Sequence, residues 1–167
     1  MRLAKARLIR LATPADVPSI LHLERSCGSA AHWTEQQYRQ VFESGGPERL
    51  VLVADAPFHS VSDEALPDAG PNITGFLVAL HVAPEWELEN LVVAPSGRRQ
   101  GFGKRLLQAL LAKARATNSK SVFLEVRESN AAARGLYEKA GFEQAGRRKS
   151  YYKNPAEDSV LYRSALE

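Results

Sequence analysis

The stretch NLVVAPSGRRQGFGKRLLQALLAKA, residues 90–114, decides how the rest of the chain is predicted to fold. Its apolar run at 91–93 is typical of the end of a buried strand. Pro-Ser-Gly at 95–97 supplies turn residues, and apolar residues then recur at helical spacing over 106–114. We therefore predict a strand, a loop that contains glycine, and a helix that begins near Gly103.

The loop between this strand and this helix is a candidate anion site. Residues 98–104 carry two glycines and three cations in seven positions. A helix start has free backbone N–H groups, and its dipole attracts an anion, most often a phosphate. Gly101 and Gly103 lack a Cβ, so the main chain can come close to such a ligand. The residues alone also allow a second interpretation, a flexible helix entry with a solvated basic loop.

Two familiar phosphate-binding loops do not fit these residues. A Walker loop needs a glycine five positions before the Gly-Lys pair and a Ser or Thr directly after it. Positions 98 and 105 are both arginine in this chain. A dinucleotide-binding fingerprint needs a third glycine, and the chain has Leu106 there. Both classes of site are therefore excluded on residue identity.

Two motifs resemble a known family. The pattern R-x-x-G-x-G at 98–103 resembles the acyl-CoA pyrophosphate loop of the GNAT superfamily of N-acyltransferases. Residues 124–142, LEVRESNAAARGLYEKAGF, are similar to the matching segment of the bacterial ribosomal-protein-alanine N-acetyltransferases, the RimI type. The two motifs with their strand span 91–142, and weaker similarity extends to IRLATPAD at 9–16 and to the tyrosine pair at 151–152.

Length and composition are those of one ordinary globular domain. The chain has 167 residues, of which 44% are apolar and 25% are charged. Its net charge of +3 favours an anionic ligand or a ribosomal neighbourhood without requiring either. No segment is apolar over the length of a membrane span, and no signal-peptide core is visible, so no membrane contact is predicted. The single cysteine, Cys27, makes a reducing cytoplasm the simplest compartment.

The predicted fold class is α/β (α+β), a mixed and mostly antiparallel central sheet flanked by helices, as the resemblance also implies. The predicted order over the single N-acetyltransferase domain, 1–167, is β-α-α-β-β-β-α-β-α-β-β. Strands are predicted at 7–11, 50–54, 73–82, 86–93, 121–127, 142–150 and 159–166, with 151–157 as the last loop. Helices are predicted from Pro14 to Cys27–Gly28, from Thr34 through Phe42, from near Gly103, and from the cap Asn130 to Ala140.

The segment 55–72 interrupts this pattern. Its prolines, glycine and acidic residues show no periodicity, which predicts a long mobile hairpin loop. The corresponding connection is usually short in the resembled family, so it is either an inert insertion or a flap that binds a partner.

Two residues outside these motifs, Cys27 and Trp33, have two interpretations each. Cys27 is either a nucleophile or, more in keeping with free cysteines, a small buried hydrophobe. Trp33 either lines a substrate mouth or fills the core, and its loop position favours a mixture of both.

Two residues are candidates for acid–base chemistry. Glu125 lies in the apolar run at 122–126, where an unpaired carboxylate would be costly, so it is either a general base or a structural partner of Arg127 on the same strand face. Tyr137 is either a packed ring or a catalytic hydroxyl. Asn130 either only caps its helix or also contacts a cofactor. The resemblance places the base at Glu125 and the acid that protonates the departing thiolate at Tyr137.

The resemblance implies direct acetyl transfer from acetyl-CoA within a ternary complex, with no metal. Glu125, directly or through water, would deprotonate the substrate ammonium, and a main-chain N–H near Val93 would stabilise the oxyanion. The pyrophosphate would lie on backbone N–H groups of the glycine loop, and the pantetheine arm would pair with the preceding strand. The predicted cofactor-binding residues are Leu91, Val92, Val93, Arg99, Gln100, Gly101, Phe102, Gly103, Lys104 and Asn130.

The implied acceptor is a protein N-terminus, foremost the alanine of the eighteenth small-subunit ribosomal protein. A small amine, an antibiotic or a lysine side chain are the neighbouring alternatives, and a non-catalytic acyl-CoA-binding module is an alternative of another class. Nucleic-acid binding is disfavoured, because the cations cluster on one loop without interleaved aromatic residues. The sequence leaves the oligomeric state open between a monomer and a weak dimer.

Overall fold

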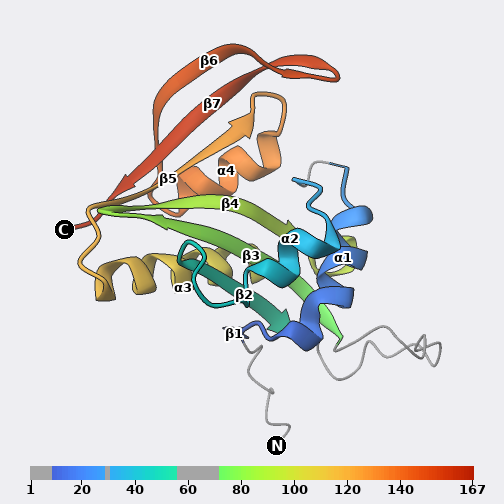
Figure 1. Ribbon diagram of the computed structural model, residues 1–167. Coiled ribbons are helices and arrows are strands. Elements are labelled where there is room, and N and C mark those ends of the chain that lie inside the picture. Colours follow the sequence, from blue (N-terminus) through green and yellow to red (C-terminus); the bar gives the residue numbers. More distant parts are fainter. Residues whose placement is uncertain (1–8, 29–30, 56–71) are drawn as a thin grey trace, which may run out of the picture.

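The computed structural model describes residues 9–28, 31–55 and 72–167 (Figure 1). In this part of the chain a seven-stranded sheet has the order β1-β2-β3-β4-β5-β7-β6. The strands are β1 Ile9–Leu11, β2 Arg49–Asp55, β3 Ile73–Val82, β4 Glu85–Val93, β5 Ser121–Arg127, β6 Glu143–Lys153 and β7 Ala156–Ala165. Only β4 and β5 pair in parallel, and all other neighbours are antiparallel. The predicted mixed, mostly antiparallel sheet is confirmed.

Helices cover both faces of this sheet (Figure 1). They are α1 Val17–Arg25, α2 Glu35–Gln40, α3 Phe102–Ala116 and α4 Ala131–Lys139, with short 3-10 turns η1 Pro14–Asp16 and η2 Pro95–Gly97. The order of helices and strands is the predicted one. The predicted first helix divides into η1 and α1, because Pro18 has no N–H to continue the first turn, and α1 ends at Arg25. No helix in the described ranges has the length and apolar character needed to cross a bilayer.

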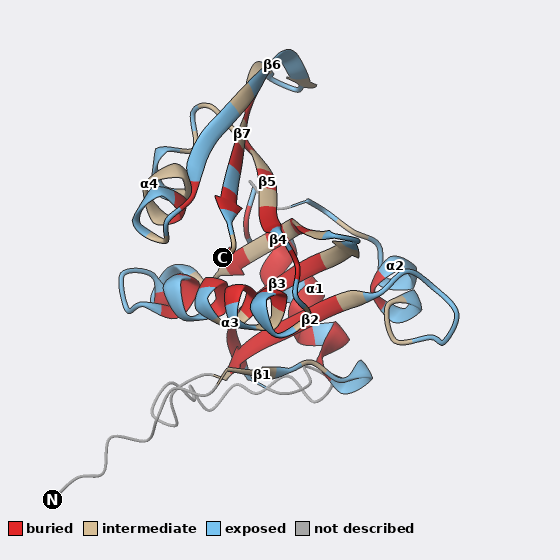
Figure 2. Cartoon of the chain, turned by 90° about the vertical axis from the view of Figure 1, so that its left-hand side faces the viewer, coloured by how far each residue is buried: buried red, intermediate tan, exposed pale blue. Residues whose placement is uncertain are grey.

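Two apolar clusters hold the layers together. The first packs α3 and α4 against the sheet, and its helical stripe is the predicted one: Leu106, Leu107, Leu110, Leu111 and Ala114. Figure 2 shows this buried stripe of α3 turned towards the strands. The second packs α1 and α2 on the opposite face, with Tyr38 and Phe76 as its large rings. Each fully buried leucine contributes roughly 1.5–3 kcal/mol, so the α3 stripe alone fixes this helix on the sheet.

A bulge in β4 changes which residues face which layer. Leu88 lies opposite Ala79 of β3, whereas Asn90 lies opposite Val78, so Glu89 is the extra residue. Before the bulge the even-numbered residues of β4 face α3, and after it the odd-numbered residues do. A shift of one residue exchanges the two faces of a strand. The bulge therefore sets the face on which the last residues of β4 lie.

The two parallel strands separate halfway along. Pairing joins only Glu85–Leu88 of β4 to 121–124 of β5. Beyond these residues β4 continues to Val93 and β5 to Arg127 without pairing to each other, and the ribbons diverge (Figure 1). This separation, the opening between β4 and β5, leaves one edge of β4 without a neighbouring strand over its last residues.

The last hairpin differs from the prediction. Residues 151–157 were expected to be a loop, but β6 runs to Lys153 and β7 begins at Ala156. Tyrosines favour strands, and a register shift between Arg148 and Tyr152 absorbs the irregular residues between them. Residues 7–8 of the first predicted strand and 56–71 of the predicted hairpin insertion lie outside the described residues.

Candidate active site

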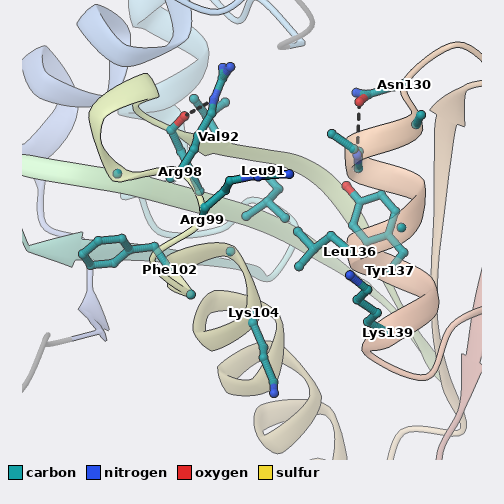
Figure 3. Close-up of a pocket in the computed structure, with 18 of the residues that line it drawn as sticks. Leu91, Val92, Arg98, Arg99, Phe102, Lys104, Asn130, Leu136, Tyr137 and Lys139 are labelled. Carbon is teal, nitrogen blue, oxygen red and sulfur yellow. Dashed lines mark hydrogen bonds between the residues drawn. The ribbon is translucent and has the colours of Figure 1, made fainter.

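A cavity of about 770 Å³ opens where β4 and β5 separate, between the start of α3 and the helix α4 (Figure 3). Its volume is within the range of cofactor and small-molecule sites. The lining residues come from the end of β4, the loop before α3, and α4: Cys27, Leu91, Val92, Val93, Gly97, Arg98, Arg99, Gly101, Phe102, Gly103, Lys104, Asn130, Ala131, Ala132, Ala133, Gly135, Leu136, Tyr137 and Lys139. All the predicted cofactor contacts except Gln100 are among them.

Positions 101 and 103 of the loop are glycine for different physical reasons. Gly101 caps α3 with φ +83°, in the left-handed region, and a Cβ there would meet open space. The open space lets a ligand approach the backbone at the helix start. A Cβ on Gly103 would instead lie 2.9 Å from Leu136 Cδ2. Gly103 therefore permits close packing of α3 on α4, a role that the sequence did not predict.

Four cations border the cavity: Arg98, Arg99, Lys104 and Lys139 (Figure 3). Arg98 Nε donates to the carbonyl oxygen of Val93 at 3.4 Å, which ties the loop to the end of β4. Among the described residues no carboxylate lines this cavity. The cations and the backbone N–H groups at the start of α3 together suit an anionic ligand.

Tyr137 projects its hydroxyl from α4 into the cavity (Figure 3). Its ring packs 5.9 Å from the ring of Phe142 and 6.3 Å from that of Tyr162, measured between centroids. Burial, and to a smaller extent Tyr152, raises the pKa of Tyr137. The hydroxyl therefore carries its proton at neutral pH and can donate it. Asn130 caps this helix by accepting a hydrogen bond from the Ala133 N–H at 3.2 Å, which confirms the predicted cap.

Glu125 lies outside the cavity lining, on the face of β5 away from α3. The even-numbered neighbours on β5 are buried under α3 and α4, so Glu125 projects from the opposite face. Its Oε1 lies 3.0 Å from Nη2 of Arg148 on β6. The alternative of a structural pair with Arg127 is wrong, because that arginine pairs with Glu157 and stacks over Tyr152 at 4.1 Å.

Gln100 does not line the cavity, and several residues that do line it were not predicted. The Gln100 side chain turns back on η2, where its Nε2 donates to the Ser96 carbonyl oxygen at 2.7 Å. Arg98 was visible as the first residue of the loop motif but was not assigned to the site. The remaining missed residues line the cavity only through tertiary packing: Cys27, Gly97, Ala131, Ala132, Ala133, Gly135, Leu136 and Lys139. Cys27 is 6% exposed, which agrees with a small buried hydrophobe.

A buried polar network holds α1 and α2 to β4 next to the cavity. Glu24 and Tyr38 are 1% and 0% exposed, and Asn90 is 6% exposed. Oε1 of Glu24 accepts from the Tyr38 hydroxyl at 2.8 Å and from Asn90 Nδ2 at 2.9 Å. Asn90 directly precedes the strand residues that line the cavity. The network therefore fixes the position of that strand end.

The face of the sheet opposite the cavity carries carboxylates where the strands part. Glu87, Glu89 and Glu125 project from it. Arg49 binds both oxygens of Glu89, at 2.8 Å and 3.1 Å, and its guanidinium lies 5.3 Å from the Trp33 ring centroid. Trp33 also packs on Tyr38, with 5.3 Å between ring centroids, and lines a second cavity of about 460 Å³. The packing role of Trp33 is therefore confirmed, and its place at a substrate mouth stays a prediction.

Comparison with known proteins identifies the family. Residues 18–142 match the model of the acetyltransferase (GNAT) family, and the chain belongs to this family. Ribosomal protein bS18-alanine N-acetyltransferase of Escherichia coli K12 is 32% identical over 148 residues, which cover 87% of this chain and 88% of that protein. The protein of the same name from Haemophilus ducreyi is 40% identical over 84 residues, 50% of this chain and 58% of that protein.

The fold agrees with this assignment. The crystal structure of the ribosomal-protein-S18-alanine N-acetyltransferase from Escherichia coli aligns with a TM-score of 0.76 and 27% identity. The alignment covers 96% of this chain and 94% of that one. The predicted family and the predicted fold class are confirmed.

Proposed function

We propose that this chain acetylates the N-terminal amine of a protein with acetyl-CoA as donor, and that the alanine of the eighteenth small-subunit ribosomal protein is its substrate. The observation that carries the proposal is the opening between β4 and β5. Beside this opening, a cationic cavity with a protonated tyrosine lies on one face of the sheet, and a group of carboxylates lies on the other. The names of the relatives in Escherichia coli and Haemophilus ducreyi support the choice of acceptor.

The residues of the cavity fit the proposed donor. Backbone N–H groups at the start of α3, together with Arg99 and Lys104, suit a diphosphate. The free edge of β4 at Leu91 and Val93 offers main-chain hydrogen bonds to the amide groups of a pantetheine arm. The small residues that begin α4 leave room for this arm. The donor supplies an acetyl group activated as a thioester.

The proposed reaction balances with two side chains. Glu125 takes a proton from the substrate ammonium, directly or through water, and the freed amine forms a bond to the thioester carbonyl carbon. The N–H of Val93 is proposed to stabilise the oxyanion. The carbon–sulfur bond then breaks, and the Tyr137 hydroxyl gives its proton to the sulfur. The nitrogen of the new amide gives up its second proton, which restores the Tyr137 hydroxyl, and Glu125 releases the first proton to solvent. Because both reactants are held at one opening, proximity supplies a large part of the rate. A ribosomal acceptor places the enzyme in the cytoplasm.

The test is incubation of the purified protein with acetyl-CoA and a peptide that begins with the mature, alanine-first sequence of the host's own protein bS18. We expect one acetyl group at the N-terminus, located by fragmentation mass spectrometry, and no product without either reactant. Acetylation only at lysine would favour the lysine alternative. Equal rates on Ser- or Met-initial peptides would remove the narrow substrate assignment.

Two variants test the residue roles. Tyr137→Phe removes only the hydroxyl and leaves the ring packing on Phe142, so kcat should fall roughly 10²- to 10⁴-fold while the KM for acetyl-CoA changes little. Glu125→Gln should lower kcat by a similar factor. A rise in melting temperature with acetyl-CoA, but no turnover of any amine by the wild type, would support a non-catalytic acyl-CoA-binding module.

A further inference from the structure

Glu87 is a carboxylate on β4 that the reaction above does not use. It is half-buried, and it makes no ion pair or hydrogen bond with any other described residue. It directly precedes Leu88, the last residue of β4 that pairs with β5. Glu87 therefore lies directly beside the point where β4 and β5 stop pairing.

Glu87 and Glu125 lie on the same face of the sheet. Glu87 is in register with Phe123, and Glu125 is two residues further along β5, so the two share a face. Strand spacing and rise place their Cα atoms roughly 8 Å apart, within reach of one ligand atom held between two glutamate side chains. Both side chains project from the face of the sheet opposite α3, the face that also carries Glu89.

The cations close to Glu87 already have partners. Arg49 binds both oxygens of Glu89, and Arg148 is bonded to Glu125. Burial raises the pKa of Glu87, and the charges of Glu89 and Glu125 raise it further, against the opposing influence of both arginines.

Other charged groups belong to the same surroundings. The charge of Glu125 contributes to raising the pKa of Tyr152 on β6. Arg127 lies beside Tyr152 and forms an ion pair with Glu157. None of these groups supplies a free cation to Glu87. An ionised Glu87 is therefore costly until a cation arrives.

We propose that Glu87, together with Glu125, binds the ammonium group of the acceptor and so selects a protonated amine. The inference rests on the proposed function, because it concerns the same reaction. An ammonium has three donors on one compact centre and can be shared between two carboxylates. A hydroxyl or amide group in that position leaves the charge of Glu87 without compensation, since only Glu125 already has a partner in Arg148, and this disfavours such ligands. Glu87 is thus a specificity-determining residue for the acceptor.

The test compares Glu87→Gln with Glu85→Gln. Both variants remove one negative charge from the same face of β4, but Glu85 is already paired with Arg163 and lies at the far end from the opening. We expect Glu87→Gln to raise the KM for an alanine-initial peptide roughly 10- to 100-fold, the size of one charge-assisted hydrogen bond. The KM for acetyl-CoA should stay within about twofold in both variants, because neither residue lines the donor cavity.

A binding measurement separates this inference from the proposed function. Calorimetry compares the peptide with an analogue whose N-terminal amine is replaced by hydrogen. We expect the wild type and Glu85→Gln to prefer the amine, and Glu87→Gln to lose most of this preference while its circular dichroism spectrum stays that of the wild type. Equal preference in Glu87→Gln and Glu85→Gln would overturn the inference, as would a fall in kcat alone. Absence of turnover in the wild type would overturn the proposed function, and the calorimetric comparison would still decide the role of Glu87.

Discussion

Replacing Tyr38 by phenylalanine tests whether the buried network of Glu24, Tyr38 and Asn90 holds the helices to β4. The substitution deletes one oxygen and keeps the ring, so its packing on Phe76 and Trp33 remains. Oε1 of Glu24 loses the hydroxyl donor at 2.8 Å and keeps the Asn90 Nδ2 donor at 2.9 Å. The carboxylate is 1% exposed, so water does not easily replace the lost donor.

The expected cost follows from these contacts. A hydrogen bond to a charged group contributes about 1.5–3 kcal/mol, and the retained Asn90 donor places the loss near the lower end, about 1–2 kcal/mol. For a domain of this size that corresponds to a fall in melting temperature of roughly 2–8 °C. Burial and the neighbouring Glu24 raise the pKa of Tyr38, so the hydroxyl remains a donor in alkaline solution. The cost should therefore be the same at about pH 7 and pH 9.

Urea unfolding of the wild type and Tyr38→Phe measures this loss, and Tyr162→Phe is the matched control. Tyr162 is also a buried ring whose hydroxyl donates to a glutamate, Glu138, at 2.6 Å. That glutamate is exposed, so water can replace the hydroxyl, and we expect a cost below about 1 kcal/mol. A Tyr38→Phe loss no larger than the control, or below about 0.5 kcal/mol, would refute the reasoning.

Three further predictions concern the loop, the cap and the unpaired carboxylate. Gly101→Ala places a side chain at φ +83°, so calorimetry should show weaker acetyl-CoA binding, and urea unfolding a loss of about 1–2 kcal/mol. Asn130→Ala removes the acceptor of the Ala133 N–H and should lower the free energy of unfolding by about 1 kcal/mol, whereas Asn130→Asp should retain it. Glu87 has a raised pKa, so it opposes folding once the pH rises above the ordinary glutamate value. Thermal unfolding should accordingly show Glu87→Gln more stable than the wild type at about pH 8, with the difference vanishing near pH 4.

Local patterns made much of the fold predictable. The apolar spacing of α3, the cap at Asn130 and the glycine turn at Gly101 are each determined by residues close together in the sequence. The final hairpin was predicted less well. Tyr151 and Tyr152 follow an irregular segment, and their place in a strand depends on pairing with β7, which the local sequence does not show. Element order and the loop residues of the cavity were therefore accessible from the sequence.

The ion-pair partners of the charged residues could not be predicted from the sequence. Arg148 reaches Glu125 across β7, because β6 is the edge strand and pairs with β7 and not with β5. Sequence proximity favoured Arg127, which the strand order directs to Glu157 instead. Glu87 could not be singled out either, since its isolation depends on Arg49 and Arg148 being occupied elsewhere. Each of these facts depends on contacts between segments far apart in the chain.

The separation of β4 and β5 has a consequence for inhibitors. Under the proposed function, donor and acceptor approach from opposite sides of the sheet, so they need not share an entrance and neither blocks the other. A molecule that links a coenzyme A moiety to an N-terminal peptide would have to thread the opening, with one half anchored on each side. When one half dissociates, the bound half keeps it at a high effective concentration, so rebinding is fast. Complete dissociation requires both halves to be unbound at the same time. Slow dissociation of such a conjugate would thus arise from the route through the sheet itself.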